Sequence, residues 1–109
     1  MRIIAKSRII EYGKKYGPDA QDQLDSWYQE AKAANWHTPQ EIVKLYKGAD
    51  AVGKETIIFN ICHNRYRLIV NVSFSEQIVF IKFFGTHAEY NKFDLKTIRN
   101  EGKSHENKK

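Results

Sequence analysis

The strongest constraint on the fold is a change to alternating hydrophobic patterning at Thr56. Alternation with a period of two is typical of strands that expose one face and bury the other. It continues to Phe84 in three runs, at residues 56–62, 65–74 and 77–84. Only the pairs His63-Asn64 and Ser75-Glu76 separate these runs, and two-residue connections are typical of tight hairpins. The segment therefore predicts an antiparallel meander of three strands.

Two-residue turns fix the register and divide the strand side chains between two faces. One face is apolar and pairs Ile57 with Val70, Phe59 with Leu68, Ile61 with Tyr66, Leu68 with Phe83, Val70 with Ile81, and Val72 with Val79. The other face is mixed; it places Arg67 between Asn60 and Phe84, and Ile69 between Ile58 and Lys82, with Asn71 on the same side. Helices are expected to cover the apolar face and leave the mixed face as a candidate binding surface. A bulged three-residue turn would reverse this assignment.

Helical patterns fill the first half of the chain. Residues 1–4 form a short strand, and Ser7 is suited to cap a helix that carries Ile9, Ile10 and Tyr16 and ends at Gly17-Pro18. Residues 20–34 have apolar positions at helical spacing. A capping box at residues 38–41 opens a short helix that runs to Gly48, and residues 48–55 are predicted to be a loop. Helices followed by a meander indicate an α+β fold.

A second capping box, Thr86-His87-Ala88-Glu89, follows the meander. It opens a helix expected to carry Tyr90, Phe93 and Ile98, with His87 and Tyr90 on one side of the first turn. Residues 99–109 are polar and lack an apolar period, so they are predicted to be a flexible tail. We therefore expect one domain over residues 1–98.

Charge and cysteine content limit the partners and the compartment. The 109 residues include 18 Lys and Arg against 13 Asp and Glu, a net charge of +5 that favours a polyanion or an acidic protein as partner. One cysteine precludes an internal disulfide. No apolar region suits a signal peptide, and no stretch approaches the roughly 18 apolar residues of a membrane span. These features predict a soluble, cytoplasmic protein with no membrane partner.

Four side chains could carry chemistry on RNA without a metal ion. When the 2′-hydroxyl of the substrate attacks the adjacent phosphorus, the protein must supply cations and groups that move protons. Arg67 and Lys82 could supply the charge, and His87 and Tyr90 could lie at the edge of the same face. The dipole of the predicted helix also favours a phosphate there.

Each of the four also has a purely structural interpretation. Arg67 could be a solvated cation or pair with an acidic helix residue, and Lys82 could be a polar break that prevents sheet aggregation. His87 could be a surface residue, and Tyr90 could pack its ring under the sheet.

Other residues offer weaker signals. Asn60, Arg65, Asn71 and Lys92 are candidate RNA contacts. The four histidines are scattered without paired ligand spacing, so we expect no metal site, and no phosphate-binding loop or other motif indicates a cofactor.

The runs Asn64-Arg65-Tyr66-Arg67-Leu68-Ile69-Val70 and Ile81-Lys82-Phe83-Phe84-Gly85-Thr86-His87-Ala88-Glu89-Tyr90 resemble the HigB family of type II toxins. The resemblance spans about residues 2–94. It implies a RelE-like fold, in which two N-terminal helices pack on one face of a curved antiparallel sheet with a short C-terminal helix.

The resemblance also implies a function and site roles. Members are mRNA interferases, nucleases that cleave mRNA on the translating ribosome and leave 2′,3′-cyclic phosphate and 5′-hydroxyl ends. A helix-turn-helix antitoxin of the HigA type neutralises them. By motif position, Arg67 is similar to the arginine that clamps the scissile phosphate and Lys82 to a basic position on the next strand. His87 and Tyr90 are similar to acid/base or base-stacking groups.

Two other functions fit the same residues. A non-catalytic RNA- or ribosome-binding module could stack bases on Phe80, Phe84 and Tyr90. A protein-interaction domain could instead use the basic face to receive an acidic segment of its partner.

Overall fold

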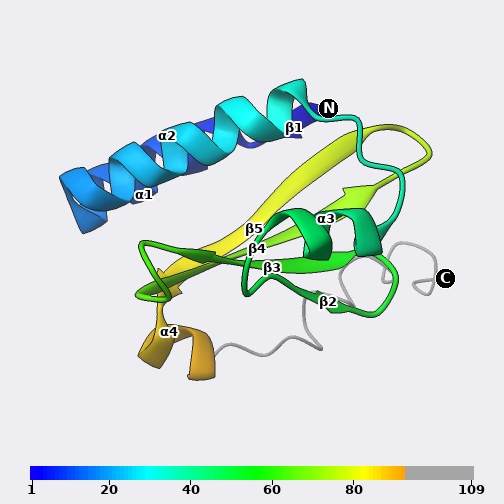
Figure 1. Ribbon diagram of the computed structural model, residues 1–109. Helices are drawn as coiled ribbons and strands as arrows, with labels where there is room; N and C mark the ends of the chain where they lie inside the picture. The colour runs from blue at the N-terminus through cyan, green and yellow to red at the C-terminus, as the bar shows by residue number, and fades with distance from the viewer. Residues whose placement is uncertain (93–109) are drawn as a thin grey trace, which may run out of the picture.

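Within residues 1–92, five strands form one mixed sheet in the order β1-β5-β4-β3-β2, accompanied by four helices (Figure 1). The computed structural model describes residues 1–92. The strands are β1 (Arg2–Ile4), β2 (Asp50–Val52), β3 (Thr56–Ile61), β4 (Tyr66–Ser73) and β5 (Ile78–Thr86). The helices are α1 (Lys6–Tyr16), α2 (Pro18–Ala33), α3 (Pro39–Leu45) and α4 (His87–Lys92). The fold is α+β, as the sequence predicts.

The expectation of an antiparallel sheet was wrong in part, because one strand is parallel to its neighbour. β1 runs parallel to β5 and pairs Arg2, Ile3 and Ile4 with Ile78, Val79 and Phe80. The chain leaves β1 and returns to β5 only after three helices and three strands, and a parallel neighbour requires such a long connection.

The segment predicted as a loop contains an edge strand, β2. Asp50 pairs with Ile58 and Val52 pairs with Thr56 across a tight turn that includes Gly53, at φ 73°. A strand of three residues is too short to display a hydrophobic period, which is why the pattern did not reveal it.

The β3–β4 register is the predicted one. Ile57, Phe59 and Ile61 oppose Val70, Leu68 and Tyr66. The backbone N–H of Arg65 donates to the carbonyl of Cys62 at 3.1 Å, closing the turn around His63 and Asn64.

The predicted β4–β5 register is observed only in the half nearest the turn between these strands. Val72 pairs with Val79 and Val70 with Ile81, but Ile69 then pairs with Phe83 because a β-bulge inserts Lys82. The predicted pairs of Leu68 with Phe83, Arg67 with Phe84, and Ile69 with Lys82 were therefore wrong. Leu68 instead opposes Phe84, and Arg67 opposes Gly85. The extra residue reverses the faces that follow it, so Phe84 is buried in the main core.

The core lies between the apolar face of the sheet and helices α1, α2 and α3. Ile9, Leu24 and Ile42, one from each helix, are buried in one cluster with the strand residues. Figure 1 shows α1 and α2 running side by side on one side of the sheet. At one end of this core, four rings stack or meet edge to face: Tyr12, Tyr16, Tyr66 and Phe84.

Helix boundaries differ from the prediction in three places. α2 ends at Ala33, one residue before the predicted end. α1 begins at Lys6, with Ala5 in the capping position, rather than after Ser7. α3 begins as predicted, because the Thr38 hydroxyl accepts from the Glu41 N–H at 3.3 Å, but it ends at Leu45 instead of Gly48. The expected helical positions Phe93 and Ile98 and the predicted tail at residues 99–109 lie outside the described residues.

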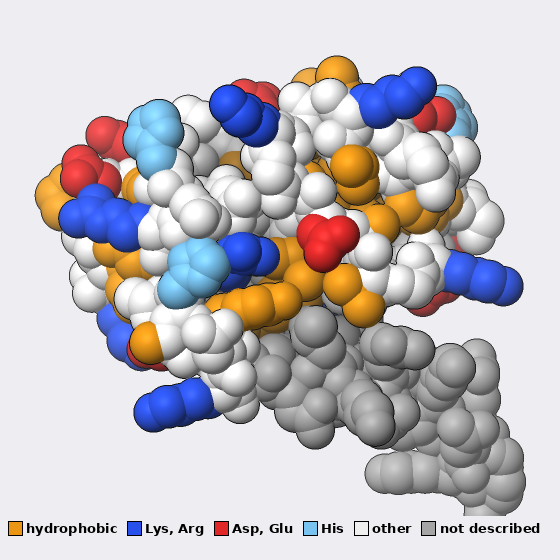
Figure 2. Space-filling model, turned by 60° about the horizontal axis from the view of Figure 1, so that its bottom comes forward, with side chains coloured by type: hydrophobic (Ala, Val, Ile, Leu, Met, Phe, Trp, Pro, Cys, Tyr) orange, Lys and Arg blue, Asp and Glu red, His pale blue; other side chains and the backbone are white. Residues whose placement is uncertain are grey.

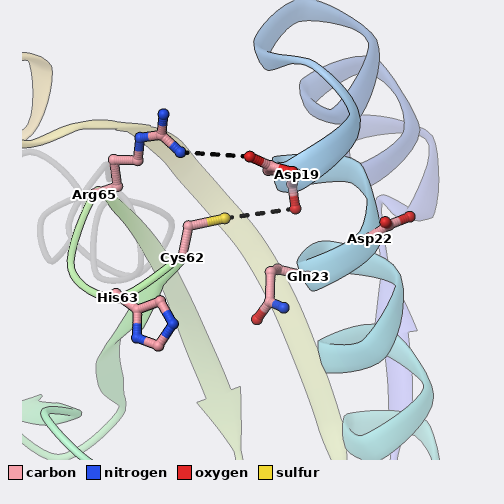
Figure 3. A pocket seen from close by; sticks show the side chains of 6 residues that line it. All are labelled: Asp19, Asp22, Gln23, Cys62, His63 and Arg65. Atoms are coloured by element: carbon pink, nitrogen blue, oxygen red, sulfur yellow. Dashed lines mark hydrogen bonds and ion pairs between the residues drawn. The ribbon is translucent and has the colours of Figure 1, made fainter.

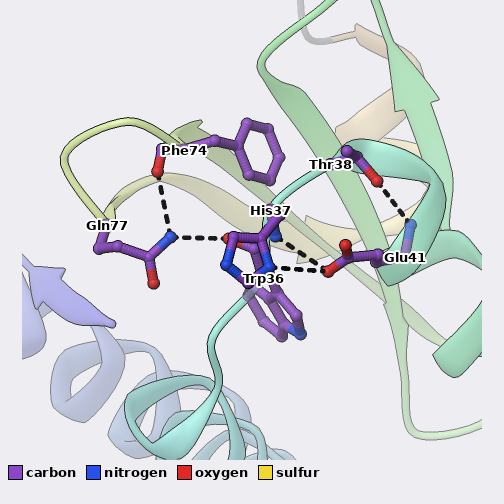
Figure 4. A network of polar contacts seen from close by, with 6 residues as sticks. All are labelled: Trp36, His37, Thr38, Glu41, Phe74 and Gln77. Carbon is purple, nitrogen blue, oxygen red and sulfur yellow. Dashed lines mark hydrogen bonds and ion pairs between the residues drawn. The ribbon is translucent and has the colours of Figure 1, made fainter.

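A polar network joins the α2–α3 connection to the β4–β5 turn (Figure 4). The Gln77 amide donates to the carbonyl of Trp36 at 2.7 Å and to that of Phe74 at 3.1 Å. The backbone N–H of His37 donates to the Glu41 carboxylate at 2.9 Å.

Within residues 1–92, no helix is long and apolar enough to cross a membrane.

Candidate active site

Three of the predicted side chains meet where β4 lies beside α4. The Arg67 guanidinium stacks over the ring of Tyr90, with its carbon 5.0 Å from the ring centroid. Its Nε lies 3.4 Å from Nε2 of His87. All three residues are half-buried. The bulge makes Gly85, rather than Phe84, the cross-strand neighbour of Arg67. We call Arg67, His87 and Tyr90 the Arg-His-Tyr cluster.

The second capping box forms as predicted and orients α4. The Thr86 N–H donates to the Glu89 carboxylate at 2.8 Å, and the Thr86 hydroxyl accepts from the Glu89 N–H at 3.2 Å. Because Glu89 already occupies the Thr86 N–H, that donor is not open to a phosphate. The capping box therefore sets the direction of the helix that carries His87 and Tyr90.

Tyr16 connects α4 to α1. Its hydroxyl donates to Glu89 at 2.6 Å. This hydrogen bond, followed by the one from the Thr86 N–H, lowers the pKa of Glu89. The pKa of Tyr16 is raised, first by burial and then by its bond to Glu89. The pair stays as phenol and carboxylate near neutral pH.

Gly85 allows α4 to approach the sheet closely. A Cβ atom at this position would lie 2.7 Å from Oε1 of Glu89 and 2.8 Å from the ring of Phe83. Any larger residue would require both side chains to move.

A small apolar cluster lies beside the Arg-His-Tyr cluster. Ile58 and Ile69 are buried on the mixed face, with Val52, Phe83 and Tyr90 packed against them. Figure 2 brings forward the side away from α1 and α2 and shows Lys, Arg and His side chains beside a band of hydrophobic ones. Tyr90 therefore packs on this apolar cluster, as its structural interpretation predicted, and also holds the Arg67 guanidinium over its ring face.

Lys82 occupies the extra position of the β5 bulge. The Arg8 guanidinium, from α1, donates to the carbonyls of Ile81 and Lys82 at 2.9 and 3.4 Å. β1 pairs with β5 only as far as Phe80, so Arg8 satisfies carbonyls beyond the end of β1.

The two predicted asparagine contacts are engaged inside the protein. Asn60 donates to the carbonyl of Gly48 at 3.0 Å, and the Asn71 amide oxygen accepts from the Thr56 hydroxyl at 2.9 Å. The first bond ties β3 to the segment before β2, and the second joins β3 to β4.

Arg65 and Lys92 are both exposed, but their surroundings differ. Lys92 lies in the last turn of α4. Arg65 lies 3.6 Å from the Asp19 carboxylate, so the helix ion pair considered for Arg67 is made by Arg65 instead. Arg65 also lines a hollow of about 210 Å³ between the β3–β4 turn and α2 (Figure 3). In that hollow, burial and then Asp19 raise the pKa of the Cys62 thiol.

Sequence patterns did not identify Asn64 as part of this site. Its amide oxygen lies 3.0 Å from Nε2 of His87. The contact spans 23 residues, and no periodicity relates a turn to a helix that far along the chain. The signal that could have drawn attention to Asn64 is its place in a tight turn next to two arginines.

The chemical capacity of the site is electrostatic binding combined with proton transfer. Arg67 presents a permanent cation, and an imidazole readily gains and loses a proton near neutral pH. Within residues 1–92, no group of three or more His, Cys, Asp or Glu side chains could hold a metal ion.

Comparison with known proteins identifies the family. Residues 20–93 match the HigB toxin family, described as the RelE-like toxic component of a toxin–antitoxin system. The mRNA interferase HigB of Escherichia coli O6:H1 (strain CFT073) is 30% identical over 94 residues, which cover 84% of this chain and 90% of that relative. The match includes β3, β4, β5 and all three residues of the Arg-His-Tyr cluster, so the chain belongs to the HigB toxin family.

Proposed function

We propose that this chain is an endoribonuclease toxin that cleaves mRNA without a metal ion. The observation that carries the proposal is the convergence of Arg67, His87 and Tyr90 from β4 and α4. Family membership adds weight, because the curated relative is called an mRNA interferase. An antitoxin is the expected protein partner of a toxic component, and we propose that it is a helix-turn-helix protein of the HigA type.

In the proposed reaction the RNA supplies its own nucleophile. The 2′-oxygen bonds to phosphorus while its proton passes to solvent. The bond from phosphorus to the 5′-oxygen breaks, and that oxygen takes a proton. The products are a 2′,3′-cyclic phosphate and a 5′-hydroxyl, and the step requires charge stabilisation and proton transfer rather than a metal.

We propose roles that are compatible with the geometry of the cluster. Arg67 binds the non-bridging phosphate oxygens, where two parallel N–H donors suit a phosphate. His87 gives the proton to the 5′-oxygen. Tyr90 supports the guanidinium and stacks with an unpaired base. We assign Lys82 to neutralising charge on the phosphate.

Arg65 and Lys92 are proposed to contact the RNA backbone beside the cluster. Both are exposed cations on elements that contribute to the site. Asn60 and Asn71 remain predicted contacts that would first have to release their internal hydrogen bonds. We further propose that the substrate is mRNA on the ribosome, in the cytoplasm.

The test is the chemistry of the cut ends. The purified full chain is incubated with mRNA, with and without ribosomes, in EDTA, and the ends are mapped. We expect new 5′-hydroxyl and 2′,3′-cyclic phosphate ends, with ribosomes increasing their yield. Intact mRNA that is nevertheless bound would support a binding module instead, and cleavage abolished by EDTA would contradict the proposed chemistry.

A further inference from the structure

The β3–β4 turn holds Asn64 in a backbone conformation that few residues adopt. Cys62, His63 and Asn64 have φ values of 55°, 52° and 77°, in the left-handed region where asparagine is more tolerated than most residues. α2 braces this turn: the Cys62 thiol lies 3.5 Å from the Asp19 carbonyl, and Arg65 pairs with the Asp19 carboxylate (Figure 3). The turn therefore presents the Asn64 side chain to α4 from a fixed position.

Two groups of opposite character approach one nitrogen of His87. The Asn64 amide oxygen, 3.0 Å from Nε2, can only accept a hydrogen bond. The Arg67 Nε, 3.4 Å from the same nitrogen, can only donate one. Nε2 carries either a proton or a lone pair, so it can satisfy one of these partners at a time.

The distances favour Asn64. A separation of 3.0 Å is near the usual length of such a bond, whereas 3.4 Å is beyond its normal range. Arg67 also retains its contact with the Tyr90 ring if it makes no bond to His87. The nearest carboxylate on α4, Glu89, is bonded to Tyr16 and Thr86.

We infer that Asn64 is a positioning residue that keeps a proton on Nε2 of His87, the ring nitrogen facing Arg67. Its amide oxygen stabilises the Nε2–H form of the neutral ring and the same N–H of the protonated ring. The inference concerns the protein before any substrate binds.

The consequence for catalysis rests on the proposed function. A phosphate held by Arg67 would lie next to Nε2, so the proton would already be on the correct nitrogen. The protonated ring gives the Nε2 proton to the 5′-oxygen and becomes neutral with its proton on Nδ1. Nε2 then has a lone pair, which can accept from Arg67 Nε–H, and solvent restores the proton.

The primary test is the tautomer of His87 in the full chain. Nitrogen-15 spectra of the imidazole rings, recorded at increasing pH until the His87 signals no longer change, distinguish Nε2–H from Nδ1–H in the neutral ring. A His87→Gln variant assigns the signals. We expect Nε2–H in the wild-type protein, and a wild-type Nδ1–H ring would overturn the inference whether or not any variant folds.

Three variants sharpen the test. Asn64→Gly removes the amide, and glycine suits a positive φ; we expect His87 to change to Nδ1–H. Asn64→Asp retains an acceptor oxygen and cannot donate, so we expect Nε2–H to persist. His63→Asn changes the neighbouring turn residue and should leave the tautomer unchanged. An Nε2–H ring in folded Asn64→Gly would contradict the role of Asn64.

Cleavage rates separate this inference from the proposed function. On ribosome-bound mRNA we expect Asn64→Gly to be slower by about tenfold or more, since positioned acid catalysis contributes about 10²–10⁴-fold in total, and His63→Asn to match the wild type. A wild-type protein that leaves mRNA intact would refute the function, while the spectra would still decide the role of Asn64. Equal rates in wild type and Asn64→Gly would refute the catalytic role of Asn64 alone.

Discussion

Two arginines, Arg65 in the β3–β4 turn and Arg67 in β4, have different environments, and the difference separates them as candidate site residues. Arg65 is exposed and pairs with Asp19 on α2. Arg67 is half-buried, and within residues 1–92 it contacts His87 and Tyr90 but no carboxylate. A cation without a carboxylate partner in a partly desolvated position is suited to bind an anion. The sequence placed both arginines near one hairpin but could not show which of them had an acidic neighbour.

The aromatic face of Tyr90, rather than its hydroxyl, is expected to matter. We predict that Tyr90→Phe keeps the cleavage rate within about threefold, because the ring face that holds Arg67 remains. Tyr90→Leu should reduce the cleavage rate about tenfold or more, because it removes the ring that holds Arg67. It also removes base stacking, which contributes about 1–3 kcal/mol. Single-turnover cleavage of ribosome-bound mRNA measures both. An equal loss in Tyr90→Phe would instead assign proton transfer to the phenol.

Glu89 makes the attachment of α4 sensitive to acid. Its pKa is lowered from 4.5 by the bond from Tyr16 and then by that from Thr86. The carboxylate therefore stabilises the fold above its unfolded pKa, and this contribution is lost as pH falls through the folded value. We expect Glu89→Gln to lower the thermal midpoint at pH 7, with the gap to wild type closing as pH falls below 4.5. A gap that is constant with pH would contradict this.

At the scale of elements, local patterns predicted most of the fold. The three long strands, both capping boxes and the β3–β4 register follow from alternation and from short-range hydrogen bonding. The edge strand β2 was missed because three residues carry no period. The strand at residues 1–4 was predicted, but its parallel pairing with β5 was not. The bulge at Lys82 was missed because it lies within β5 and not at a turn.

Phe83 and Phe84 provide a direct test of the bulge. Uninterrupted alternation predicts Phe83 in the main core, whereas the structure buries Phe84 there, at 3% exposure, against Tyr12, Tyr16 and Tyr66. We expect Phe84→Ala to destabilise the protein by about 3–5 kcal/mol and Phe83→Ala by clearly less. Denaturant unfolding of the two variants measures this, and the reverse order would refute the bulged register.

At the scale of the whole molecule, the site combines segments far apart in the sequence. A turn, the start of β4 and the first turn of α4 contribute Asn64, Arg67, His87 and Tyr90. The alternation of strand side chains could place Arg67 on the mixed face, and the capping box could place His87 at the start of a helix. Their contact depends on the bulge, on Gly85 and on the Tyr16–Glu89 bond, and each of these is a tertiary feature.

The net charge of +5 predicts salt-dependent RNA binding. Each phosphate contact on single-stranded RNA contributes a slope of about 0.7 in a plot of log affinity against log salt. We expect Lys92→Ala to reduce that slope by about this amount. Lys14→Ala, an exposed cation on α1, is the matched control and should leave it unchanged. Equal slopes for all three proteins would argue against an RNA contact on α4.

The most direct test of the site is the cleavage rate of Arg67→Ala beside that of Arg65→Ala, with thermal midpoints measured on the same preparations. Loss of the phosphate-binding cation should slow cleavage by about 10²–10³-fold, as removal of one charge-stabilising donor does elsewhere. Arg65→Ala should slow cleavage far less than Arg67→Ala does, and both variants should stay folded. Arg67→Ala that cleaves as fast as Arg65→Ala, or that loses activity only in proportion to unfolding, would contradict the assignment of this site.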